Sequence, residues 1–312
     1  MPRLGWLVGR LLQIVPTFLL IGIAVFVLAR LLPGDAVSAM LGDRASDATI
    51  NRLTAELGLN RSLGAQLLAF LTAAAQGDFG ASLSRHVPVM RLVAEALPVT
   101  LSLVAIATTL ALAIALPLAF IAALNANRWP DIAIRAVFQV GLSSPVFYIG
   151  LILLTVFAGW LGWFPVGGYG ESVSEHLYHL FLPGLTLSLS FAAVVMRNLR
   201  AAVLAVLTAE YVDFARAKGL ARSVVLLRHV LRNALIATVT LVGLHVGALL
   251  GGAVITETVF AVPGVGRLMI DSIFARDYPV IQALTLVLAV LVSLAFLVTD
   301  FVQMWLDPRV GR

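Results

Sequence analysis

The chain has 312 residues, of which 61% are hydrophobic and only 12% are charged. A soluble domain carries about 25% charged residues, so this composition excludes a soluble protein and indicates an integral membrane protein. The net charge of +5 therefore concerns loops and lipid rather than nucleic acid, and the absence of cysteine excludes disulfides and thiolate sites.

Six stretches are long and apolar enough to cross a bilayer, which takes about 20 predominantly apolar residues. The first follows Arg3 and Arg10 as a signal peptide would, but its apolar run is longer than the core of a cleaved signal, so we expect an uncleaved anchor. The sequence thus predicts an all-α protein with transmembrane helices at 11–32, 97–124, 132–158, 178–196, 235–256 and 280–304.

The long connection after the first span, residues 33–96, contains two further helical patterns. Residues 46–58 and 62–77 each combine apolar residues at helical spacing with a final glycine that stops the helix. We expect two short helices on the outer surface. No repeat or low-complexity linker divides the sequence, so we predict a single membrane domain.

Lysine and arginine set the orientation of the spans. They gather in the N-terminal tail, in the connections after the second and fourth spans, and in the C-terminal tail. The opposite set of connections, apart from the long one, holds only Arg267 and Arg276. By the positive-inside rule, both termini and the segment 197–234 lie in the cytoplasm.

Several spans contain residues that interrupt or bend helices. Pro117, Pro183 and the motif GLSSPVF at 141–147 are such points, because proline removes a backbone hydrogen bond of the helix. Two interpretations of the motif stay open. Its central residues line a conduit, or they serve helix packing; they are Ser143, Ser144 and Pro145.

The sequence lacks the motifs of several enzyme classes. Its only lysine, Lys218, is followed rather than preceded by glycine, so the chain has no phosphate-binding loop of its own for ATP. His176 and His179 have a spacing that metal ligands use, but a structural pair beside the fourth span is the favoured interpretation. Inside the spans, Asp300 and His245 are the ionisable groups that a self-contained secondary carrier or channel would use.

A polar insert, residues 209–220, lies between the fourth and fifth spans and reads as a helix that ends at Gly219. Tyr211, Phe214 and Leu220 form an apolar stripe. Composition leaves two interpretations: a helix resting on anionic lipid, or a helix whose aromatic side chains anchor in a cytoplasmic partner. The charged residues around the stripe are Glu210, Asp213, Arg216 and Lys218.

EYVDFARAKGL at 210–220, followed by RHVLRNAL at 228–235, resembles the cytoplasmic loop of binding-protein-dependent ABC importer permeases of the dipeptide/oligopeptide/nickel group. The likeness extends over nearly the whole chain, in the order expected for the first, B-type, permease subunit of that group. It includes LLPGD (31–35), LGLNRSLGAQ (57–66), GDFGASL (77–83), LPVTLSL (97–103), SSPVF (143–147), LPGLTLSL (182–189), ETVFAVPGVGRL (257–268), RDYPVIQ (276–282) and DPRV (307–310).

The resemblance implies a type I importer permease in the bacterial cytoplasmic membrane. It divides the chain into a first helix and outer loop (1–96) and core helices (97–312), with a cytoplasmic coupling segment (197–234). The partners it implies are a homologous second permease, one or two ATPase subunits that bind ATP and Mg, and an extracytoplasmic substrate-binding protein. The residues it assigns to ATPase coupling are Glu210, Tyr211, Asp213, Phe214, Ala215, Arg216, Lys218 and Gly219.

The implied function is import of di- or oligopeptides by a transport subunit that is not itself an enzyme and holds no cofactor. The substrate stays open among dipeptides, longer peptides, glutathione, haem and nickel complexes. One position departs from the general family pattern, because Asp213 stands where a glutamate precedes the glycine by six residues. The segment 262–279 and the loop 33–96 would meet the substrate-binding protein.

Overall fold

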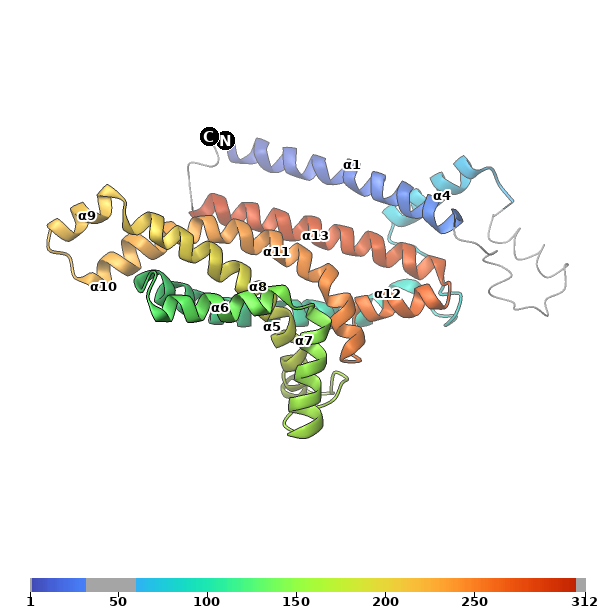
Figure 1. Cartoon of the computed structure of the whole chain (residues 1–312). Coiled ribbons are helices and arrows are strands. Elements are labelled where there is room, and N and C mark those ends of the chain that lie inside the picture. Colours follow the sequence, from blue (N-terminus) through green and yellow to red (C-terminus); the bar gives the residue numbers. More distant parts are fainter. Residues whose placement is uncertain (1, 32–59, 307–312) are drawn as a thin grey trace. The chain divides into compact units, whose positions relative to one another are not determined.

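The computed structural model describes residues 2–31 and 60–306, and within them the chain is helical, with one isolated bridge between Ala81 and Pro88 (Figure 1). The expected helix at 46–58 lies outside the described residues. The helices are α1 (Pro2–Leu31), α4 (Leu63–Ala75), α5 (Val89–Leu124), α6 (Trp129–Ser143), α7 (Val146–Leu153) continuing as η1 (Leu154–Trp160), α8 (Val173–Leu207), α9 (Glu210–Ala217), α10 (Arg222–Val224), η2 (Val225–Leu231), α11 (Arg232–Val259), α12 (Val265–Phe274) and α13 (Tyr278–Leu306).

Four of these helices are long and apolar enough to cross a membrane: α5, α8, α11 and α13. They confirm four of the expected spans, each extended by several residues. α1 covers the first expected span and has its apolar stretch at Val15–Leu28. The outer helix expected at 62–77 is present as α4, where the Ser62 hydroxyl accepts a hydrogen bond from the Ala65 N–H.

The third span was predicted as one helix, and this is wrong. α6 and the α7–η1 helix are bent by 104° at a break between residues 143 and 146. The reason is local. Ser144 adopts an extended backbone, as residues before proline prefer, and Pro145 cannot continue the hydrogen bonding of α6. Pro117 and Pro183, by contrast, lie within continuous helices.

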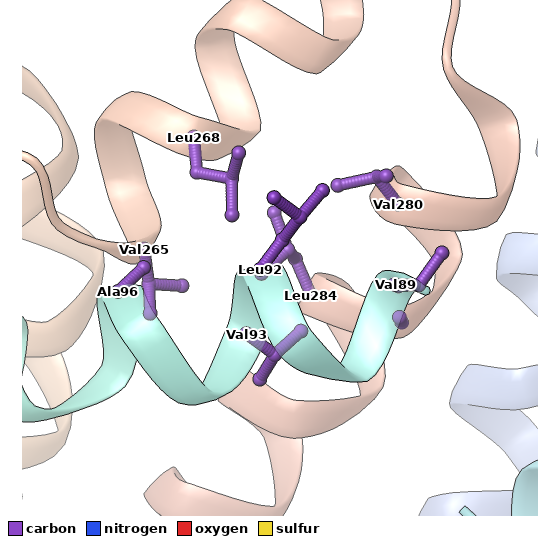
Figure 2. Close-up of a cluster of buried hydrophobic side chains, with 9 residues drawn as sticks. Val89, Leu92, Val93, Ala96, Val265, Leu268, Val280 and Leu284 are labelled. Carbon is purple, nitrogen blue, oxygen red and sulfur yellow. The ribbon is translucent and has the colours of Figure 1, made fainter. Parts of the chain in front are cut away.

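The chain forms two compact units, of which the first contains the described parts of Arg3–Thr100 together with Pro263–Ser293. Its apolar core is shown in Figure 2. The start of α5 packs there against α12 and the start of α13, and the Thr100 hydroxyl accepts a 2.8 Å hydrogen bond from the Val265 N–H. The buried side chains of the core are Val89, Leu92, Val93, Ala96, Val265, Leu268, Val280, Ala283 and Leu284.

A buried carboxylate holds a loop of this first unit. Asp277 accepts hydrogen bonds from the hydroxyls of Ser82 (2.5 Å) and Ser84 (2.7 Å) and from the N–H groups of Leu83 and Ser84 (both 3.1 Å). Burial alone raises the pKa of this carboxyl, but the hydrogen bonds outweigh it and hold the pKa below the ordinary value of 3.8. Segments from the two ends of the chain are thereby joined.

The second unit, Leu101–Val262 with Leu294–Arg312, is built around α8, which packs against α6, α7 and α11. Small residues permit close approach of its helices. A Cβ atom at Gly184 of α8 would lie 2.7 Å from Ile106 of α5, and one at Gly243 of α11 would overlap Thr299 of α13. This unit carries the polar insert that the sequence singled out.

Candidate functional site

α9 forms for local reasons. Ala209 has the extended backbone of a helix-capping residue, and Glu210 and Asp213 place negative charge in the first turn, where the helix dipole favours it. Arg216 lies in the last turn, and Gly219 ends the segment with a φ of +76°, a conformation that favours glycine. The helix and its glycine stop, expected from the sequence, are confirmed.

The two faces of α9 differ in their surroundings. Val212 and Ala215, three residues apart, are buried against the chain. Tyr211 and Phe214 lie on the other side and are 44% and 68% exposed. Large aromatic side chains dominate the free energy of many protein interfaces, so these two form an exposed apolar surface that is suited to contact with a partner or with lipid.

The chain behind α9 supports it. α10 and η2 return from the Gly219 turn to α11, and η2 contacts α9 and buries Val225 and Val230. α9 and α10 therefore stand beyond one end of α8 and α11 (Figure 1). The exposed basic residues of this end are Arg216, Lys218, Arg222, Arg228 and Arg232.

Charge on α9 itself is exposed. Arg216 pairs with Asp213 at 3.1 Å, with both side chains more than half exposed, so the pair contributes little to stability. The Lys218 side chain has no hydrogen bond or ion pair among the described residues. These side chains are available for contacts outside the chain.

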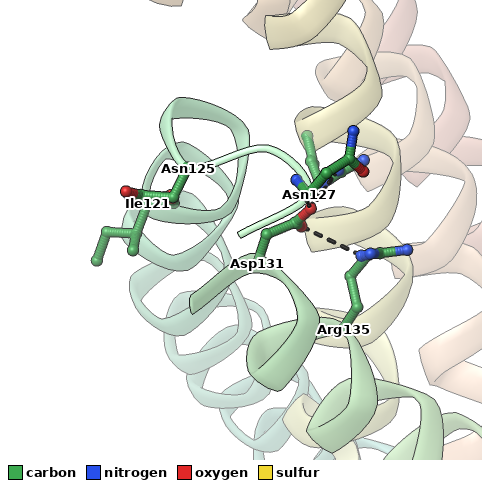
Figure 3. A network of polar contacts seen from close by, with 6 residues as sticks. Ile121, Asn125, Asn127, Asp131 and Arg135 are labelled. Carbon is green, nitrogen blue, oxygen red and sulfur yellow. Dashed lines mark hydrogen bonds and ion pairs between the residues drawn. The ribbon is translucent and has the colours of Figure 1, made fainter. Parts of the chain in front are cut away.

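A buried ion pair lies on the path from α9 into the spans. Arg200 of α8, seven residues before the helix ends, donates hydrogen bonds of 2.6 Å from Nε and from an Nη atom to the two carboxylate oxygens of Asp131 in α6. Asp131 also accepts from the Asn127 N–H at 2.8 Å and from Arg135 at 3.2 Å (Figure 3). The first turn of α6 is thereby fixed to the end of α8 that leads to α9.

Sequence reasoning missed this ion pair. In the sequence, the arginines indicate only the orientation of the spans, and no role is predicted for Asp131. The available signal was Asp131 directly after Pro130, in a first helical turn, four residues before Arg135. Its partner on α8 is not visible in any local pattern.

Ser143, Ser144 and Pro145 form the break between α6 and α7. The hydroxyl of Ser143 donates to the Gln139 carbonyl and that of Ser144 to the Val140 carbonyl, each at 2.9 Å, so both satisfy the end of α6. The structure does not bring these residues to α9, because they lie at the opposite end of α6 from Asp131. Their role in a conduit stays a prediction.

The histidines inside or beside the spans are packed against neighbouring rings and carbonyls. His245 stacks on Phe191 with ring centroids 5.3 Å apart, and its Nδ1 lies 3.0 Å from the Leu241 carbonyl oxygen. His176 stacks on Tyr169, whereas His179 approaches the Gly167 carbonyl at 2.9 Å. Among the described residues, no three histidine or acidic side chains gather as metal ligands would.

Comparisons with known proteins identify the family of the chain. The family described as binding-protein-dependent transport system inner membrane component matches residues 115–312, and the N-terminal part described for such components matches residues 3–104. The glutathione transport system permease protein GsiC of Escherichia coli is 38% identical over 307 residues, which cover 98% of this chain and 99% of that protein. The oligopeptide transport system permease protein AppB of Bacillus subtilis is 38% identical over 312 residues, with 98% and 99% covered.

Solved structures show the same fold at low sequence identity. A chain of the inward-facing MetNI methionine ABC transporter matches with a TM-score of 0.59 and 16% identity, covering 70% of this chain and 97% of that chain. A chain of an amino acid ABC transporter matches with a TM-score of 0.50 and the same identity, covering 70% and 94%. The expected importer permease, a multi-pass membrane protein, is confirmed. The chain belongs to the family of binding-protein-dependent transport system inner membrane components.

Proposed function

We propose that this permease forms, with a second permease, the path of an ATP-driven importer, and that α9 is the helix through which an ATPase subunit moves it. The observation that carries the proposal is the asymmetry of α9. Its Val212 and Ala215 hold it to the chain, while Tyr211 and Phe214 face outward. The buried face gives the helix a rigid support, and the exposed aromatics give a partner two anchors.

The proposed topology has six spans, with both termini and α9 in the cytoplasm and residues 33–96 outside. α1 and the bent pair of α6 with α7–η1 supply the two spans beyond the four long apolar helices. The distribution of lysine and arginine supports this orientation. ATP and Mg are then bound by the partner ATPases, which is consistent with the lack of a phosphate-binding loop in this chain.

The substrate class we propose is a peptide, with glutathione as a small member of the class. The names of the relatives support it, because GsiC and AppB are described as glutathione and oligopeptide transport permeases. A substrate-binding protein delivers this cargo to the first unit. There, the side chains of Ile273 (50% exposed) and Phe274 (85% exposed) end α12 and offer an apolar contact.

ATP binding favours one arrangement of the partner ATPases. Because α9 is fixed to the spans, the movement of the ATPases shifts the spans and thereby opens the path to one side of the membrane or the other. The order of transmission we propose runs from α9 to α8 and then, through Arg200 and Asp131, to α6. A secondary carrier that uses His245 is disfavoured, because the ring is stacked on Phe191 and has a neighbouring carbonyl partner.

The test is the double variant Tyr211→Ala/Phe214→Ala in the reconstituted transporter. Both side chains are exposed, so the variant is expected to insert and fold. Peptide uptake and recovery of the ATPase with the permease should each fall by at least tenfold. Phe301→Ala is the matched control, since Phe301 is 59% exposed on α13 and should leave both unchanged. Full uptake by the double variant would exclude α9 as the coupling element.

A further inference from the structure

A cavity of about 500 Å³ lies between α6 and α8, within the second unit. A volume of this size holds a small ligand or part of a larger one. The side chains that decide its chemistry are Arg135, Gln139 and Leu142 of α6 and Met196, Arg197 and Arg200 of α8. Neither the coupling helix nor the break at Pro145 contributes to its lining.

The cavity carries a net positive charge. Arg135 and Arg200 share one carboxylate, Asp131. The Arg197 side chain is exposed and has no hydrogen bond or ion pair among the described residues. Three guanidinium groups therefore face a single negative charge, and the excess favours an anion with several acceptor oxygens, such as a phosphate.

The lining changes in character along the helices. α6 and α8 are antiparallel here, so Arg135 and Arg200 lie near the end that leads to α9, while Leu142 and Ala193 lie deeper. From Arg135 to Leu142 the cavity follows α6 for about 10 Å, at 1.5 Å per residue. A ligand that fills it is charged at one end and apolar at the other.

The outer surface of α6 is suited to lipid. Its exposed apolar side chains include Val137 (70% exposed) and Val140 (68% exposed). Trp129, at the start of the helix, is 79% exposed, and tryptophan is enriched where a span meets the headgroup region. The charged end of the cavity is therefore the end nearer the headgroup region.

We propose that an anionic phospholipid occupies this cavity, with its phosphate on Arg135 and Arg197 and an acyl chain along Leu142. Basic pockets between spans bind such headgroups on the positively charged side of membrane proteins. The bound lipid bridges α6 and α8 beside the Asp131–Arg200 pair. No residue of α9 lines this site, and the proposal does not depend on the identity of the substrate.

The first test is lipid retention by the full complex extracted in mild detergent and analysed by native mass spectrometry. After exchange against equal amounts of phosphatidylglycerol and phosphatidylethanolamine, the wild type should retain phosphatidylglycerol selectively. Removing one guanidinium weakens such binding about fivefold, so Arg197→Ala should raise the lipid concentration for half-occupancy by that factor, and Arg197→Glu by more. Arg232→Ala is the control, because Arg232 is exposed at the start of α11 and does not line the cavity.

The second test locates the lipid. A phosphatidylglycerol with a photoreactive acyl chain should label peptides that contain residues 132–142 and 193–200. Leu142→Trp, which fills the apolar end, should reduce this labelling and leave binding of short-chain phosphatidylglycerol unchanged. Inorganic phosphate and a soluble acidic peptide serve as competitors. Displacement of the lipid by either at millimolar concentration, or unchanged retention in Arg197→Glu, would overturn the proposal.

Discussion

Arg200 of α8 and Asp131 of α6 meet through two hydrogen bonds of 2.6 Å, although they lie 69 residues apart in the sequence. The Asp131 side chain is fully buried, and that of Arg200 is 16% exposed. A guanidinium and a carboxylate in this bidentate geometry fix both the distance and the relative rotation of their helices. Removing one partner leaves the other charged and short of hydrogen bonds.

Asp131→Asn should therefore lower the free energy of unfolding by about 3–5 kcal/mol, the usual cost of breaking a buried ion pair. Unfolding in sodium dodecyl sulfate, followed by circular dichroism, measures the change. Glu95→Ala is the control, since Glu95 pairs with Arg91 on an exposed surface and its loss should cost less than about 1 kcal/mol. Equal destabilisation by the two changes would refute a structural role for the buried pair.

The contact of Gly243 with α13 gives a second prediction. Any Cβ atom at this position would overlap Thr299, so Gly243→Ala should separate α11 from α13 and cost about 1–3 kcal/mol. Gly251, on the same helix, has no atom within 4 Å of a Cβ atom, and Gly251→Ala should be neutral or stabilising. Thermal unfolding of the two variants in detergent measures the difference, and a similar midpoint for both would contradict the packing argument.

The hydrogen bonds to Asp277 give a third prediction, which concerns pH. Since the pKa of Asp277 in the folded chain lies below its ordinary value of 3.8, ionised Asp277 stabilises the fold above that pH. The stabilisation is lost as the pH falls through the folded pKa. Asp277→Asn should thus be destabilising at pH 7, by about 1.5–3 kcal/mol, and approach the wild type in stability at low pH.

The readout for Asp277 is the unfolding midpoint of each chain from pH 7 down to pH 3. Asp271→Asn is the matched control. Asp271 is half exposed and pairs with Arg85 at 3.7 Å, so its neutralisation should change the midpoint little. A stability difference for Asp277→Asn that is independent of pH would show that the carboxylate charge is not what holds the loop.

The left-handed turn at Gly219 gives a fourth prediction. No atom lies within 4 Å of a Cβ at this position, so a side chain there costs only backbone strain, on the order of 1–2 kcal/mol. Gly219→Val should shift α9 on its support and reduce peptide uptake several-fold. Gly219→Asn should retain more uptake, because asparagine tolerates this conformation better. Equal peptide uptake by the two variants would show that coupling does not depend on the left-handed turn at Gly219.

The parts of the fold that the sequence predicts are those with a local cause. The α9 helix follows from its acidic first turn and its glycine stop, and α4 from Ser62 and its leucines. The spans follow from composition alone. Pro145 signals a break in the third span, but the 104° angle between its halves depends on packing against α8, which no local pattern encodes.

The contacts that the sequence does not predict join distant segments. Asp131 finds Arg200 across 69 residues, and Asp277 finds Ser82 across 195. In the sequence alone, Asp131 and Asp277 each have the pattern of an ordinary acidic residue at the start of a helix. The sequence indicates the apolar stripe of Tyr211 and Phe214 on α9, but it does not indicate that Val212 is buried against the chain.

The core formed by the start of α5 with α12 has a consequence for biosynthesis. Thr100 and its partner Val265 are 165 residues apart, and the apolar side chains Leu92 and Val93 share one buried core with residues 265–284. At a synthesis rate of about 5–20 residues per second, residues 265–284 are made on the order of 10 s after the start of α5. A ribosome that stalls before residue 265 therefore leaves this apolar face without part of its core, and the unit completes its folding only when the last span is being made.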